Sequence, residues 1–155
     1  MRVGVRGFTL VELVVVLSIA AALAATLGPK FFTQQTFSQR GYADEVAAAL
    51  RFTQKTAVIT GCAAELNVTP TTYVATQQSA SGNGCNSTDT RWATPVLGAD
   101  GIAIQGSAPA GTSASPTGIY MFDTQGRLSS SPGTTLTIGA RSITIIVGTG
   151  LVQVQ

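Results

Sequence analysis

The stretch that decides the fold reads GFTLVE at residues 7–12 and LVVVLSIAAALAATL at residues 13–27. The second part carries no charge, and about 20 apolar residues in a helix are long enough to cross a bilayer. Glu12 stands at the start of this run, where an unpaired charge costs about 2–3 kcal/mol or more. Cleavage between Gly7 and Phe8 would provide a partner. The new amino group would lie four residues, or one helical turn, before Glu12.

This combination resembles the N-terminus of type IV prepilins and pseudopilins, in which a short basic leader ends in glycine. Gly7, Phe8, Glu12 and the later Pro29 all stand at the family spacing. The resemblance implies that an inner-membrane prepilin peptidase cuts after Gly7 and methylates the amino group of Phe8. The mature subunit would wait in the bacterial inner membrane, with a periplasmic C-terminal domain. The pilus assembly platform would then add it to a filament, where Glu12 pairs with the amino terminus of another pilin or pseudopilin.

Two simpler interpretations of the apolar run are a secretory signal peptide and a plain membrane anchor. Arg2 and Arg6 would supply the basic start of a signal peptide, and the alanines of 20–25 a cleavage site. Neither interpretation explains a glutamate in the apolar run, because signal peptides and anchors avoid such a charge.

Composition predicts one small β-rich domain behind the helix. The chain has 155 residues, 17 of them glycine, and only 10% are charged. The predicted segments are the leader at 1–7, the membrane and filament-core half of a helix at 8–28, its amphipathic half at 29–61, and a globular β-domain at 62–155. Pro29 predicts a kink between the two halves, because proline removes a helical donor. The fold expected is therefore α+β: a long hydrophobic helix packed on an antiparallel sheet, as in the pilin fold that the resemblance implies.

Charge and residue usage exclude several kinds of site. The chain has 9 basic and 7 acidic residues, and the leader holds two of the basic ones, so the mature chain is close to neutral. This balance gives no expectation of a nucleic-acid partner. The absence of histidine from the sequence removes the commonest general base and metal ligand, and we expect neither a metal nor a cofactor.

The two cysteines, Cys62 and Cys85, predict a disulfide, since an even count in an exported domain is typical of a bridge. Two free buried thiols are the alternative, and they are less common outside the cytoplasm.

The helix and strand patterns are clear at both ends of the domain. Val46, Leu50, Thr53 and Ala57 form one stripe of a helix, and we expect it to pack on the β-domain of the same chain. Gly61 is expected just past the helix end. Alternation predicts a hairpin with strands at 64–68 and 71–77. We also expect an extended piece at 91–97 with Trp92 inward, a strand at 102–105, a mobile loop at 106–117, and a closing β-meander with strands at 118–123, 134–138, 142–147 and 151–154.

Two further resemblances bear on function. FDTQGR at 122–127, followed by strands and a glycine-rich end, is similar to the GspH/FimT group of minor pilins and pseudopilins. KFFTQQTF at 30–37, with the segments RGY at 40–42, AALRFTQK at 48–55 and GC at 61–62, resembles the minor pilins of mannose-sensitive haemagglutinin pili. These resemblances imply a minor type IV pilin that assembles into or primes a pilus and acts in adhesion or pilus biogenesis. The alternative is a minor pseudopilin of a type II secretion system.

The sequence gives less support to two other functions, a DNA-uptake pilin and an anchored enzyme. A pilin for DNA uptake would need arginines near the C-terminus, where Leu151 and Gln153 stand; Arg127 and Arg141, both at predicted turns, would be close enough to form at most a weak site. An anchored enzyme would need paired acids. Asp89, Asp100 and Asp123 each stand in a predicted turn, where aspartate commonly caps its own backbone. We therefore expect no enzyme activity.

Overall fold

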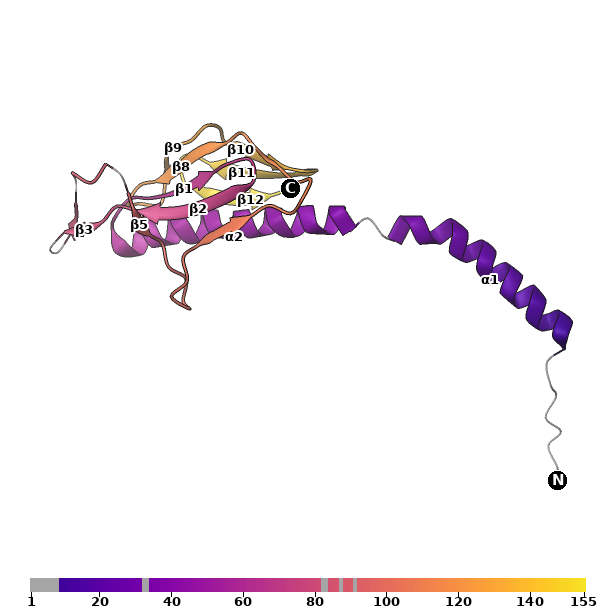
Figure 1. The fold of residues 1–155 in the computed structure, drawn as a ribbon. Helices are drawn as coiled ribbons and strands as arrows, with labels where there is room; N and C mark the ends of the chain where they lie inside the picture. The colour runs from indigo at the N-terminus through magenta and orange to yellow at the C-terminus, as the bar shows by residue number, and fades with distance from the viewer. Residues whose placement is uncertain (1–8, 32–33, 82–83, 87, 91) are drawn as a thin grey trace, which may run out of the picture. The chain divides into compact units, whose positions relative to one another are not determined.

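The computed structural model describes residues 9–31, 34–81, 84–86, 88–90 and 92–155 (Figure 1). The chain divides into two compact units, Met1–Gln34 and Gln35–Gln155. The first contains helix α1 (Leu10–Phe31), and the second is built on helix α2 (Gln34–Thr60). Antiparallel strands follow α2, so the α+β class predicted from the sequence is confirmed.

The kink predicted at Pro29 is not shown. Pro29 lies inside α1, which continues to Phe31, and residues 32–33 fall outside the described residues. Within the residues that the structure describes, no helix combines the length and the apolar character that crossing a membrane requires.

Helix α2 buries the predicted stripe. Val46, Leu50, Thr53 and Ala57 are all fully buried, and the Thr53 hydroxyl donates to the Ala49 carbonyl at 2.8 Å. The helix ends at Thr60, and Gly61 follows with a φ of +65°, the left-handed conformation that glycine adopts without strain. Both the stripe and the helix end are confirmed.

The first sheet is six-stranded, in the order β5-β2-β1-β8-β9, with β6 also paired to β2. The predicted hairpin is present, with Leu66 opposite Ala75. On its other side Leu66 faces Tyr120, so β8 returns to lie beside β1. The strands of this sheet are β1 (Ala64–Val68), β2 (Thr72–Gln77), β5 (Thr94–Pro95), β6 (Gln105–Ser107), β8 (Gly118–Phe122) and β9 (Leu128–Ser130).

A second sheet of four strands has the order β12-β11-β10-β7, and a short hairpin pairs β3 with β4. The prediction that the closing strands form one continuous meander is therefore wrong. β8 and β9 join the first sheet, while β10, β11 and β12 form the second, because β9 has no pairing with β10. These strands are β3 (Ala80–Ser81), β4 (Gly84–Cys85), β7 (Ala114–Ser115), β10 (Thr135–Ile138), β11 (Arg141–Ile146) and β12 (Leu151–Val154).

The middle of the chain also differs from the expectation. The strand predicted at 102–105 begins at Gln105, and the segment predicted as a mobile loop at 106–117 contributes β7, which pairs with β10. Period-two alternation is too short in these pieces to mark a strand, since β7 has only two residues. Their place is set by the partner strands.

One hydrophobic core lies between α2 and the inner faces of both sheets. Residues alternate inward along each strand, so Leu66, Tyr120 and Phe122 from the first sheet and Leu136, Ile143 and Ile145 from the second are almost completely buried. Polar contacts at the edge of this core fix α2 further. The Tyr73 hydroxyl donates to a Glu45 carboxylate oxygen at 2.6 Å, and burial, together with this hydrogen bond and the charge of Glu45, raises the pKa of Tyr73.

Gln54 connects α2 to two turns that are far apart in sequence. Its side-chain amide donates to the carbonyl of Gly126 at 2.8 Å and to that of Thr149 at 2.9 Å. The first carbonyl belongs to the β8–β9 turn and the second to the β11–β12 turn. Gly150, with a φ of +66°, lies against both Gly126 and Gln54. One helical side chain thus holds the ends of both sheets.

Candidate functional site

The N-terminal end of α1 is organised by a cap. The Thr9 hydroxyl accepts the backbone N–H of Glu12 at 3.2 Å, and the Thr9 carbonyl accepts the N–H of Leu13 at 3.2 Å. This is the geometry of an N-cap threonine, which satisfies one of the free donors of the first helical turn. This role was not predicted, although Thr9 followed three residues later by Glu12 has the spacing of a capping box.

The cap fixes the position of Glu12. α1 begins at Leu10, so Glu12 is the third helical residue, with an exposed side chain. A carboxylate in the first turn interacts favourably with the helix dipole, by about 0.3–1 kcal/mol at an exposed site. The expected spacing of one helical turn between Phe8 and Glu12 is not tested, because Gly7 and Phe8 lie outside the described residues and α1 begins only at Leu10.

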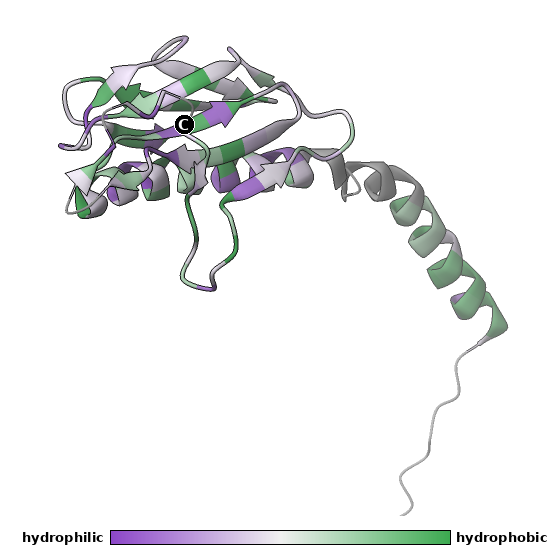
Figure 2. Ribbon diagram, turned by 60° about the vertical axis from the view of Figure 1, so that its left-hand side comes forward, coloured by the Kyte–Doolittle hydropathy of each residue, from purple (hydrophilic) through white to green (hydrophobic). Residues whose placement is uncertain are grey.

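The surface of α1 between Leu10 and Leu23 is mostly aliphatic. Its large aliphatic side chains there are 49% to 79% exposed, and Figure 2 shows most of this part of the helix in green. The hydroxyl of Ser18 donates to the carbonyl of Val14 at 2.8 Å, so this polar group is satisfied inside the helix. A helix packed against a globular domain shows a single apolar stripe, whereas the aliphatic side chains of α1 between Leu10 and Leu23 extend beyond one stripe. Between Leu10 and Leu23, Glu12 is the one ionisable residue of α1.

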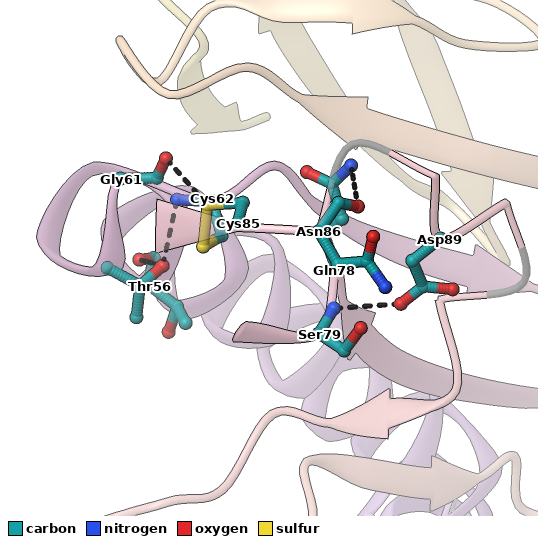
Figure 3. Close-up of a disulfide and its surroundings, with 9 residues drawn as sticks. Thr56, Gly61, Cys62, Gln78, Ser79, Cys85, Asn86 and Asp89 are labelled. Atoms are coloured by element: carbon teal, nitrogen blue, oxygen red, sulfur yellow. Dashed lines mark hydrogen bonds between the residues drawn. A yellow bond between two sulfur atoms is a disulfide. The ribbon is translucent and has the colours of Figure 1, made fainter. Parts of the chain in front are cut away.

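The predicted bridge is present between Cys62 and Cys85, whose Cα atoms are 5.4 Å apart (Figure 3). It joins the segment just after α2 to β4. The loop beyond is also held by side chains: the carboxylate of Asp89 accepts the N–H of Ser79 at 2.8 Å, and the side chain of Gln78 donates to the carbonyl of Asn86 at 3.0 Å. The bridge therefore ties the β3–β4 hairpin to the end of α2. This hairpin is a two-stranded sheet, separate from the two larger sheets.

The aspartates weighed as an acid pair have structural roles. The Asp100 carboxylate accepts the N–H of Ile102 at 3.0 Å. Asp123 accepts the N–H of Gln125 at 2.9 Å and that of Arg127 at 2.8 Å. Desolvation alone would raise the pKa of Asp123, but the hydrogen bonds from Arg127 and Gln125 and the charge of Arg127 outweigh it and lower the pKa. No group of three metal-ligating side chains occurs among the described residues.

The two arginines considered for DNA lie at opposite ends of the domain. Arg127 is in the β8–β9 turn beside Gln54 and pairs with Asp123 at 3.1 Å. Arg141 shares a cavity with Gln39. Fifteen helical residues separate Gln39 from Gln54, a span of roughly 22 Å. The expectation that Arg127 and Arg141 lie close together is wrong, because the β8–β9 turn contacts α2 at Gln54 while the β10–β11 turn lies by Gln39, nearer the start of α2.

Comparison with known proteins finds a family match for the N-terminal segment of the chain. Residues 2–28 match the family described as the prokaryotic N-terminal methylation motif. No curated protein and no solved structure matches the chain. The motif is that of type IV pilin-like proteins, which are generally structural, and it covers Gly7, Phe8, Thr9 and Glu12. The resemblance of residues 30–155 to particular minor pilins has no counterpart in these comparisons.

Proposed function

We propose that this protein is a minor type IV pilin, cut after Gly7 by prepilin peptidase, methylated at Phe8 and added to a pilus filament that it helps to start. The observation that carries the proposal is the methylation motif at 2–28, together with a helix that starts at Leu10 and exposes large aliphatic side chains from Leu10 to Leu23. Cleavage after Gly7 would leave a mature chain that starts one residue before the Thr9 cap.

The proposed role of Glu12 follows from its surroundings. In an apolar bundle of helices its carboxylate would be costly unless it met a positive charge, and the mature amino terminus is the charge that processing creates. Because α1 begins at Leu10, we propose that the partner amino group belongs to a neighbouring subunit. The inner membrane would hold α1 before assembly; this rests on the sequence of residues 8–28.

Co-expression with prepilin peptidase followed by mass spectrometry tests the processing. We expect loss of residues 1–7 and the mass of one added methyl group on the new N-terminus. An N-terminus within residues 20–26 would instead mean cleavage of an ordinary signal peptide, and the proposal would be abandoned.

Filament incorporation tests Glu12. Glu12→Gln should be processed normally and yet enter filaments poorly, since it keeps the shape of the side chain and loses the charge. Ser18→Ala is the matched control, because the Ser18 hydroxyl bonds only within its own helix among the contacts seen. Normal incorporation of Glu12→Gln, measured against Ser18→Ala by immunoblot of sheared filaments, would refute the pairing.

The alternative is a minor pseudopilin of a type II secretion system, which uses the same helix chemistry. A deletion strain separates the two. Loss of pili on electron micrographs, with normal export of secreted hydrolases, supports the pilin. Lost export with normal pili supports the pseudopilin.

A further inference from the structure

A polar cavity of about 410 Å³ opens beside the start of α2. Helix α2 supplies one wall and the β10–β11 turn the other, and Gln155, just after β12, also lines it. Its lining residues are Thr36, Gln39, Arg40, Ala140, Arg141 and Gln155. The turn packs closely on the helix, because a side chain at Gly139 would come within 2.6 Å of the Gln39 amide oxygen.

Two arginines, Arg40 and Arg141, line the cavity, and its lining includes no Asp or Glu. Arg40 and Arg141 take part in no ion pair among the residues that the structure describes, whereas Arg127 pairs with Asp123. Gln155 pairs with Ser142 through its main chain: its oxygen accepts the Ser142 N–H at 3.2 Å, and its N–H donates to the Ser142 carbonyl at 2.8 Å. Two unpaired guanidinium groups, each a rigid fork of donors, match the oxygens of a phosphate.

The position of the cavity along the chain indicates which kind of molecule would carry the phosphate. Arg40 is six residues after Gln34, about 9 Å along the helix, and the chain leads from this end of α2 into α1. Phe37, three residues before Arg40, is 71% exposed. Helices that lie at the membrane–water interface typically carry Phe, Trp or Leu on one face and Lys or Arg on the other.

We propose that the Arg40–Arg141 cavity binds the phosphate of an anionic phospholipid headgroup while α1 is held in the bilayer, with Phe37 at the interface. The membrane placement of α1 rests on the proposed function; the cavity and its charges do not. Each basic residue near an anionic surface contributes about 1 kcal/mol, equivalent to about fivefold in affinity. Duplex DNA is the less favoured occupant, because two cations in one cavity neutralise few phosphates.

The test uses the full chain in zwitterionic detergent micelles, followed by NMR of the backbone amides of Gln39 and Ala140. Short-chain phosphatidylglycerol, phosphatidylcholine, inorganic phosphate and a short DNA duplex are titrated separately. We expect saturable shifts with phosphatidylglycerol and none with phosphatidylcholine. Arg40→Gln and Arg141→Gln should each weaken the apparent Kd about fivefold, and Lys55→Gln, which removes an exposed α2 charge outside the cavity, should leave it unchanged.

Several outcomes would overturn the proposal. Equal shifts with both lipids would mean that charge plays no part, and saturation by inorganic phosphate at the same concentration would mean a free-anion site. Tighter binding of DNA than of phosphatidylglycerol would assign the cavity to nucleic acid, and an absence of shifts would remove the site. None of these results depends on cleavage after Gly7, so a failed processing assay and a failed lipid titration are distinguishable.

Discussion

Replacement of Gln54 by methionine tests the contact that holds the two sheets to α2. The methionine side chain has nearly the same length and no donor. The carbonyls of Gly126 and Thr149, now bonded at 2.8 Å and 2.9 Å, would both lose their partner. Gly126 is buried, so its carbonyl has little access to water as a substitute.

The expected loss follows from these two bonds. A hydrogen bond contributes about 0.5–1.5 kcal/mol net, and a buried acceptor left without a partner costs about 1–3 kcal/mol. Thr149 is exposed and can bond to water, so we expect Gln54→Met to lower the free energy of unfolding by about 2 kcal/mol. Gln54→Glu should cost more at neutral pH, because a carboxylate would face two carbonyl oxygens.

Urea unfolding of the full chain in detergent, followed by far-UV circular dichroism, measures this loss. With an m-value of about 2 kcal/mol/M, a loss of this size lowers the midpoint by about 1 M. Lys55→Met, at the adjacent exposed position on α2, is the control and should stay within about 0.5 kcal/mol of the wild type. If Gln54→Met unfolds at the wild-type midpoint, the two bonds contribute nothing to stability and the reasoning fails.

Three further predictions concern single sites. Gly150→Ala should lose about 2 kcal/mol or more, because φ is +66° and the new methyl would press on the Gly126 carbonyl, whereas Gly148→Ala has open space and should be nearly neutral; similar urea midpoints would contradict this. Cys62→Ser with Cys85→Ser should cost about 3 kcal/mol, for a bridge that spans 23 residues, and thiol labelling of the unreduced, denatured wild type should find no free cysteine. The Asp123 carboxyl should titrate by NMR below the usual aspartate pKa of about 3.9. The ionised Asp123 carboxylate then stabilises the fold fully above the unfolded-chain pKa, and this stabilisation is lost as pH falls through the lower folded pKa. Asp123→Asn should therefore destabilise the protein at pH 7 and have little effect below that folded pKa. An NMR titration midpoint at the usual aspartate pKa would contradict this.

The features that sequence predicted correctly depend on near neighbours along the chain. The stripe of Val46, Leu50, Thr53 and Ala57 follows from helical periodicity, and Gly61 follows from the conformation that a helix end requires. The pairing of Cys62 with Cys85 followed from there being only two cysteines. The Thr9 cap was equally local, and its signal was present but overlooked.

The sequence by itself determined where the long helical segments and the clearly alternating strands lie, and it contains the N-terminal motif from which the function is proposed. The tertiary structure alone decided how the strands divide into two sheets, because a strand shows in its sequence which face is buried and not which strand lies beside it. It alone placed Arg141 beside Arg40 and away from Arg127, and it alone brought Gly126 and Thr149 to the same glutamine. The two Gln54 contacts join residues 72 and 95 positions apart, and their formation depends on the packing of the whole core around α2.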